Sequence, residues 1–139
     1  MARVERRFIY CCGCKADVSA RLTTGDEIYP LRIELAAMRF WKCDECLNYV
    51  GCHKSHDCKP LGVIPTPEIR DKRRLIHQVI DPLWKSGFVS RTQLYLVMAS
   101  RLGLAEYHTA NIDSIELANR VLDVAYAISR DIRSKQQIS

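Results

Sequence analysis

The sequence predicts an α+β protein in which an N-terminal zinc ribbon made of β-hairpins precedes a C-terminal bundle of three helices. Two observations support this prediction. All seven cysteines lie before the proline-rich stretch PLGVIPTP at residues 60–67, among short segments separated by turn residues. Beyond that stretch, apolar residues recur at helical spacing. We therefore expect a zinc-ribbon-like domain over residues 1–62 and a helical domain over residues 63–139, which could share one core.

The first domain is expected to consist of hairpins. The segments RFIYCCGC and ADVSARLTTGDEIYP are short, and TTGD marks a turn within the second one. The segments FWKC and NYVGC suit two strands that flank a turn between Cys43 and Cys46. Between the hairpins, the pattern of IELAAMRFWKC leaves helix and strand both open.

The first helix of the second domain is expected to begin with Thr66 as N-cap and Pro67 in the first helical position. Proline is tolerated there because the first helical N–H groups have no partner inside the helix. Asp81–Pro82 is expected to end or kink this helix. Its apolar stripe comprises Ile69, Ile76, Val79, Ile80 and Leu83.

The two helices that follow also carry end signals. Ser90 and Gln93 form a capping-box pattern, and Gly103 is expected to end that helix. The third helix would begin with Asp113 or Ser114 as its cap. The apolar stripes comprise Leu94, Val97, Met98 and Leu102 in the second helix, and Leu117, Ala118, Val121, Val124, Ala125 and Ile128 in the third.

The cysteines indicate a metal site rather than disulfides. Their number, seven, is odd, and the N-terminal stretch MARVERRFIYCC lacks the apolar core of a signal peptide, so we expect a reducing, cytoplasmic environment. Cys11 with Cys14 and Cys43 with Cys46 are C-x2-C pairs, and such a turn places two thiolates on one side of a tight loop. Four thiolates form a structural Zn²⁺ site, which leaves the ion no open position.

The remaining cysteines and two nearby histidines leave alternatives open. Cys12 could replace Cys11 as the partner of Cys14. A further group within seven residues comprises Cys52, His53, His56 and Cys58. These residues could form a second zinc site, or one of them could replace a cysteine of the first site. Alternatively, the group could be a loop beside the zinc whose histidines contact a partner.

We expect non-enzymatic binding, because the histidines match no fixed catalytic spacing. The net charge of +5 permits nucleic-acid contact without requiring it. On the first helix, Arg70, Arg73 and Arg74 lie away from the apolar stripe, where they could neutralise phosphates. A metal-dependent nuclease centred on His53 is the catalytic alternative, and a pure protein–protein interaction module is the other. The sequence contains no P-loop and no dinucleotide-binding glycine motif.

Longer stretches of the sequence resemble a known family. The C-x2-C pair near the N-terminus, FWKCDECLNYVGCHK, HQVIDPLWKSG and SRTQLYLVMASRLGL occur in the family's order. In these stretches the chain resembles the zinc-finger-containing domain proteins of unknown function from bacteriophages and prophages. The resemblance implies a zinc-binding N-terminal half with the two C-x2-C pairs at the metal positions. It also implies that His53 and Lys54 match the family's HK pair.

The same resemblance implies an intracellular phage or prophage protein, located in the cytoplasm of a bacterial host cell. We therefore expect a zinc-binding protein that engages nucleic acid or a host nucleoprotein complex, such as a defence complex that it inhibits. This last step is an analogy from the phage context rather than chemistry evident in the residues. The contact surface would comprise the loop around His53–Lys54 and the helix around Arg70–Arg74.

Overall fold

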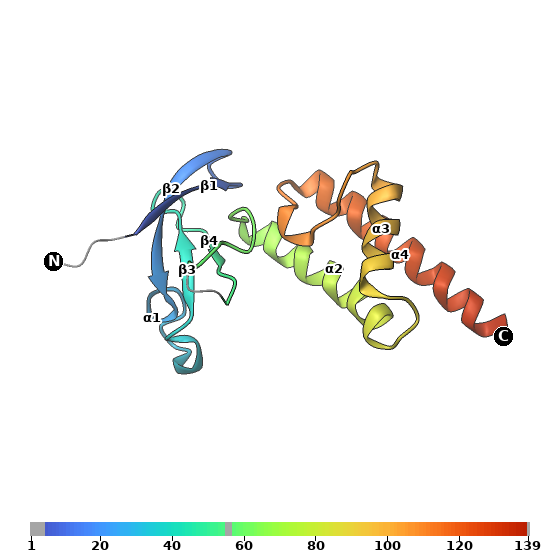
Figure 1. The fold of residues 1–139 in the computed structure, drawn as a ribbon. Helices are drawn as coiled ribbons and strands as arrows, with labels where there is room; N and C mark the ends of the chain where they lie inside the picture. Colours follow the sequence, from blue (N-terminus) through green and yellow to red (C-terminus); the bar gives the residue numbers. More distant parts are fainter. Residues whose placement is uncertain (1–4, 55–56, 139) are drawn as a thin grey trace. The chain divides into compact units, whose positions relative to one another are not determined.

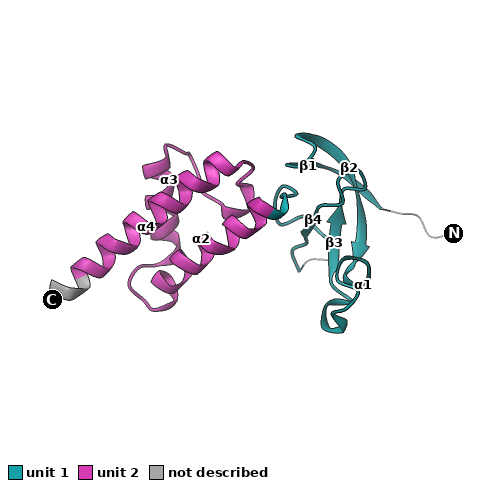
Figure 2. Ribbon diagram, turned by 180° about the vertical axis from the view of Figure 1, so that it is seen from behind, with its two compact units in different colours: residues 1–67 teal, residues 68–139 magenta. Residues whose placement is uncertain are grey.

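The computed structural model describes residues 5–54 and 57–138 (Figure 1). The chain divides into two compact units, residues 1–67 and 68–139 (Figure 2). The first unit is built mainly from strands and the second from helices. The predicted α+β class is therefore confirmed, with an antiparallel sheet followed by helices.

A four-stranded sheet forms the body of the first unit. Its strands are β1 (Arg6–Cys11), β2 (Ala16–Thr24), β3 (Arg39–Lys42) and β4 (Tyr49–Gly51). They lie in the order β1-β2-β3-β4, and every neighbouring pair is antiparallel. The two strands that the sequence predicts around the Cys43/Cys46 turn are β3 and β4. One C-x2-C pair lies at the β1–β2 turn, and the other lies at the β3–β4 turn.

The segment between β2 and β3 contains a helical turn that the sequence pattern does not predict. Helix α1 spans Gly25–Ile28, and the 3-10 helix η1 spans Ile33–Leu35. The prediction of three helices is therefore wrong, because the described residues contain four α-helices, one of them in the first unit. A Cβ atom on Gly25 would lie 1.8 Å from the Leu35 carbonyl oxygen, so only glycine allows this close approach.

The core of the first unit lies against one face of the sheet. Alternate residues of a strand point to the same face of a sheet. On the core-facing side, Ile9, Ala20 and Trp41 are buried. The Trp41 indole N–H donates a hydrogen bond of 2.7 Å to the Cys58 carbonyl oxygen, which ties the segment after β4 to the sheet. The other buried members of this cluster are Cys11, Cys43, Val50, Cys58 and Ile64.

Long amphipathic helices form the second unit. They are α2 (Pro67–Lys85), α3 (Arg91–Leu102) and α4 (Ile115–Ile138), with the 3-10 helix η2 (Thr109–Asn111) before α4. Helices α3 and α4 pack against each other. No helix in the described part of the chain combines the length and apolar character needed to cross a bilayer. The buried members of the predicted stripes are Ile69, Ile76, Ile80, Leu83, Leu94, Met98, Leu102, Ala118, Val121, Ala125 and Ile128.

Helix α2 continues past the proline where the sequence predicts an end or a kink. It begins at Pro67 as predicted and runs through Pro82 to Lys85, so the prediction of an end at this point is wrong. Pro82 removes one helical N–H donor, but Leu83 directly after it is fully buried. Burial of a leucine side chain stabilises by about 2 kcal/mol, which offsets much of that loss.

The caps of the other two helices follow the sequence signals. Ser90 and Gln93 form the complete capping box at the start of α3, and Gly103 ends it with a left-handed φ of 70°. At the start of α4, the Leu117 N–H donates to Ser114 Oγ at 3.1 Å. Of the two predicted caps, Ser114 is therefore the one whose side chain accepts this bond.

Candidate metal centre

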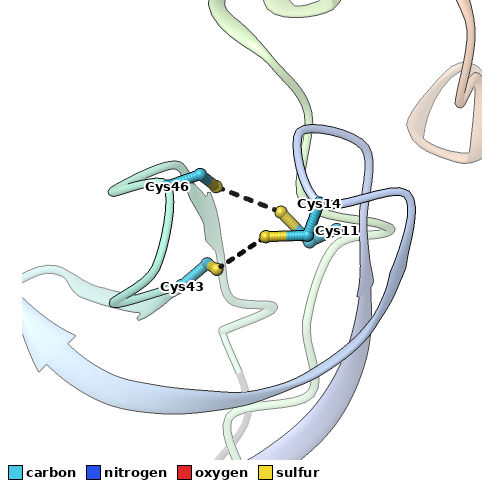
Figure 3. Close-up of side chains that lie close together, drawn as sticks. All are labelled: Cys11, Cys14, Cys43 and Cys46. Atoms are coloured by element: carbon cyan, nitrogen blue, oxygen red, sulfur yellow. Dashed lines mark hydrogen bonds between the residues drawn. The ribbon is translucent and has the colours of Figure 1, made fainter.

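Four thiols meet where the β1–β2 turn faces the β3–β4 turn (Figure 3). The Sγ atoms of Cys11, Cys14, Cys43 and Cys46 all lie within 4.8 Å of one another. Cys11 Sγ is 3.3 Å from Cys46 Sγ, and Cys14 Sγ is 3.6 Å from Cys43 Sγ. Ligands at the usual Zn–S distance in a tetrahedron are about 3.8 Å apart. The four sulfur atoms therefore match the size of a tetrahedral four-thiolate site.

The two C-x2-C turns have the same backbone design. The Lys15 N–H donates to the Cys11 carbonyl oxygen, and the Leu47 N–H donates to the Cys43 carbonyl oxygen, both at 2.8 Å. Lys15 and Leu47 each follow the second cysteine of a pair, and both have a positive φ, 55° and 68°. A non-glycine residue in the left-handed region is uncommon, so its occurrence at equivalent positions indicates a conformation imposed by the turn.

Two small polar details bring the turns together. A Cβ atom on Gly13 would lie 2.7 Å from Asn48 Nδ2 and 3.2 Å from Cys46 Sγ, so glycine is needed for the close approach. Asn48 Nδ2 lies 3.2 Å from Cys46 Sγ and donates to it, and the Asn48 carbonyl oxygen accepts from the Cys43 N–H at 2.8 Å. Such donors to ligand sulfur orient a metal ligand and tune its charge.

The thiols have different proton affinities. Burial raises the pKa of Cys11 to about 12, and the hydrogen bond with Cys43 raises the pKa of Cys14 to about 11. For Cys46, burial acts to raise the pKa, but hydrogen bonds from the Asn48 backbone and the neighbouring thiols outweigh it and lower the pKa. Zn²⁺ binds thiolates, so metal uptake by this group would release protons.

Chemically, the donor set fits a structural ion better than a catalytic one. Four sulfur ligands in a tetrahedral arrangement are typical of zinc or of iron–sulfur centres. Cys11 and Cys43 are buried, and Cys14 and Cys46 are half-buried. A four-thiolate zinc site has no position for water or substrate, so its contribution would be to cross-link the two turns.

Cys12 lies beside this group without being part of it. Its side chain is buried, and its N–H donates to the Ile64 carbonyl oxygen at 2.8 Å. The Ile64 N–H donates in turn to the Tyr10 carbonyl oxygen at 2.9 Å. The proline-rich stretch of residues 60–67 is thus fastened alongside β1 at the position of Cys12. Among the described residues, the clustered ligand atoms are those of the two C-x2-C pairs.

The second group of cysteines and histidines lies in the segment after β4. Cys58 is buried with a φ of 53°, Cys52 is half-buried, and His53 is exposed. His56 lies outside the described residues. Burial raises the pKa of Cys52 to about 11; the neighbouring Cys58 thiol also raises it, whereas Arg39 and Arg7 act in the opposite direction. Within the described part of the chain, these residues do not join the four-cysteine cluster.

The predicted contact residues of α2 have different environments. Arg73 donates to the Ile112 carbonyl oxygen at 2.6 Å, which joins α2 to the segment before α4. Arg74 is exposed and pairs with Asp71 at 2.6 Å, and Arg70 is half-buried. Lys54, in the segment after β4, is exposed.

Sequence reasoning missed two residues that position the thiols, Asn48 and Leu47. Gly13 and Lys15 stand out in the sequence because they lie in or next to the first C-x2-C turn, but their backbone roles do not. One signal was present, since each C-x2-C pair is followed by a residue that must close the same turn. The contact of Gly13 with Asn48 joins positions far apart in the sequence, so it becomes visible only in the folded chain.

Comparison with known proteins adds one match. The model of a protein family described as a zinc-finger-containing domain matches residues 6–127, which is most of the chain. No curated protein and no solved structure matches the chain. The matched range includes the four clustered cysteines and most of the second unit.

Proposed function

Because the chain belongs to the family of zinc-finger-containing domains, we propose that its four clustered cysteines bind one structural Zn²⁺ ion. The observation that supports this best is the set of four Sγ atoms within 4.8 Å of one another. With four thiolate ligands, the ion has no open coordination position and supplies no Lewis-acid chemistry. The protein is then a binding module that the ion holds in shape.

The partner is nucleic acid or a nucleoprotein complex of a host cell. In this proposal the protein derives from a phage and inhibits a host machine, such as a defence complex, by occupying its surface. The net charge of +5 supports a polyanionic partner. His53 and Lys54 are exposed on the first unit, and Arg74 is exposed on the second, so these side chains can reach a partner. Arg73 contributes charge, although one of its N–H groups is engaged with Ile112.

A binding assay at several salt concentrations tests this function. The wild-type protein, with its zinc content measured by mass spectrometry, is titrated into labelled DNA and RNA. We expect binding that weakens as salt rises, because neutralised phosphates release counterions. Replacing Arg70 and Arg74 by glutamine should reduce the slope of log K against log salt by about 1.8. Arg101→Gln is the matched control for the Arg74→Gln change, because Arg101 is also an exposed arginine paired with an aspartate, Asp131.

Two other outcomes would change the functional class. A pure protein–protein module would show no nucleic-acid affinity at any salt concentration. The exposed apolar side chains of Leu31 and Ile33, 95% and 88% accessible, favour such a module as the second candidate. A nuclease would cleave DNA or RNA with Mg²⁺ present and lose that activity in His53→Ala at unchanged zinc content. Copurification from host cells distinguishes a nucleic-acid partner from a protein partner, because it identifies the partner directly.

A further inference from the structure

A group of cations, here called the basic rim, borders the core-facing side of the sheet in the first unit. It comprises Arg7 of β1, Arg39 of β3, and Lys54 and Lys59 of the segment after β4. Arg39, Lys54 and Lys59 are exposed, and Arg7 is half-buried. The rim residues come from three separate parts of the sequence, so no local charge run marks them.

Specific contacts bring these parts together. The Arg7 guanidinium donates to the Asp57 carbonyl oxygen at 3.2 Å and lies 5.2 Å from the centre of the Trp41 ring. The His53 N–H donates to the Lys59 carbonyl oxygen at 2.8 Å, which closes the segment on itself. These bonds fix the backbone that carries Lys54 and Lys59 beside β1.

Arg39 joins the same surface through the strand register. The β3–β4 pairing matches Phe40 with Gly51, and its continuation places Arg39 opposite Cys52. The charges of both Arg39 and Arg7 act on the Cys52 thiol, so Cys52 lies within the electrostatic field of the rim. Cys52 is half-buried, so it can report on what covers this surface.

The charge balance differs between the two faces of the sheet. By strand alternation, Arg6, Arg21 and Lys42 share the opposite face with Asp17 and, through side-chain contacts, with Glu27 and Asp44. There, Arg21 binds Glu27 and Asp44 at 2.9 Å, and Lys42 binds Glu27 at 2.7 Å. Two cations, Arg21 and Lys42, are thus paired with two carboxylates, while Arg6 donates to the Ser19 carbonyl oxygen. The rim has four cations, and the acidic residues of the same segments are Glu5, directly before β1, and Asp57, in the segment after β4.

We propose that the basic rim binds the phosphate backbone of nucleic acid. This inference rests on the proposed function and names the surface and chemistry through which that function operates. The excess positive charge complements phosphates, and lysine and arginine donors fit their oxygens. Contacts of this kind position a protein without reading sequence, so the rim is a sequence-independent contact. Four contacted phosphates correspond to a salt slope of about 3.6.

The test compares two double variants that each remove two positive charges. Arg39→Gln with Lys59→Gln removes exposed cations of the rim. Arg6→Gln with Arg32→Gln is the control, because Arg6 is exposed on the opposite face and Arg32 pairs with Glu34 in the α1–η1 region. Both proteins are checked for zinc content and then titrated into two 20-base-pair DNA duplexes of unrelated sequence. In the rim variant, the magnitude of the slope of log K against log salt should fall by about 1.8 on both duplexes. In the control variant, this slope should be unchanged.

Alkylation of Cys52 gives a second measurement that does not depend on removing a charge. Peptide mass spectrometry follows the rate of Cys52 modification in the wild-type protein with and without the duplex. A several-fold slower reaction at Cys52 with DNA bound supports the rim as the contact. Cys12 and Cys58, which are buried, should stay slow in both conditions.

The outcomes separate the two proposals. If the wild-type protein binds DNA with a salt slope but the rim and control variants behave alike, and Cys52 stays equally reactive, the rim is wrong and the proposed function stands. If the wild-type protein binds no nucleic acid at low salt, the nucleic-acid function and the rim both fail. If the salt slope falls in the rim variant but not in the control, and bound DNA slows the alkylation of Cys52, the rim is established as the contact.

Discussion

The two units of this protein are stabilised by different kinds of interaction. The buried cluster of the first unit has eight members, and three of them are cysteines. The second unit contains no cysteine and buries isoleucine, leucine, valine and methionine side chains along its helices. A small unit with few large apolar residues needs a cross-link, whereas amphipathic helices gain enough from burial. The difference predicts that metal loss and core truncation act on different units.

Removal of the metal should have the largest effect. We expect Cys43→Ser, or a chelator, to unfold the first unit and leave the second helical, because structural zinc supplies about 10 kcal/mol or more in small domains. Each unit contains one tryptophan, Trp41 in the first and Trp84 in the second. Fluorescence of Trp84→Phe and Trp41→Phe variants therefore follows each unit separately. Cys12→Ser is the control and should retain zinc; simultaneous loss of both tryptophan signals would contradict independent stabilisation.

Acid should break the same unit selectively. Each ligand thiol must lose its proton to bind Zn²⁺, and the raised pKa values of Cys11 and Cys14 make protons stronger competitors. Zinc affinity therefore falls as pH falls, and the ion is released at the acid side rather than the alkaline side. A chromogenic zinc indicator, read alongside the Trp41 fluorescence, measures the release. Zinc retained through a pH range in which the Trp41 signal disappears would argue against the ion as the cross-link.

Truncation of a buried helix residue should have the next largest effect, now in the second unit. Ile80 is fully buried in α2, and Ile80→Ala should destabilise this unit by about 2–5 kcal/mol through lost burial and a cavity. Leu75 is on the same helix but 41% exposed, so Leu75→Ala should cost much less. Thermal unfolding followed by Trp84 fluorescence measures both. Zinc content should be unchanged in both variants, and a loss of zinc in Ile80→Ala would show that the units are coupled.

Loss of the α3 capping box should have a smaller effect in the same unit. Ser90 Oγ accepts from the Gln93 N–H at 3.0 Å, so Ser90→Ala leaves a helix-terminal donor without this partner. The expected cost is about 1 kcal/mol. Ser100 lies on α3 away from its N-terminus, and Ser100→Ala serves as the control with little expected change. Urea unfolding of the two variants makes the comparison, and equal midpoints would show that the cap contributes nothing.

The ion pairs of Glu27 should contribute least. Hydrogen bonds from Arg21 and then Lys42 lower the pKa of Glu27 well below its usual value. Its ionised form therefore stabilises the first unit at neutral pH, and this contribution is lost as pH falls through the folded-state pKa. Because the pairs are partly exposed, Glu27→Gln should cost less than about 1 kcal/mol. Denaturation near neutral pH tests this, with Glu45→Gln as an exposed control.

Local patterns predicted the parts of the structure that depend on neighbouring residues. The C-x2-C spacing, the strands beside Cys43 and Cys46, and the Ser90 cap each involve residues within a few positions of one another. The same kind of rule predicts that α2 ends or kinks at Asp81–Pro82; the end is wrong, because burial of Leu83 outweighs the local preference of Pro82, and the kink stays a prediction. Helix α1 was missed because its conformation depends on the approach of Gly25 to Leu35.

The sequence by itself determined the class of the fold and which cysteines could act as paired ligands, since both follow from spacing along the chain. Only the tertiary structure placed the two cysteine pairs within reach of one ion and fitted Gly13 against Asn48. It also engaged Arg73 with Ile112 and joined Arg7 of β1 to the Asp57 carbonyl oxygen in the segment after β4. The physical reason is that strand pairing and burial decide which distant residues meet, and neither is encoded in local spacing.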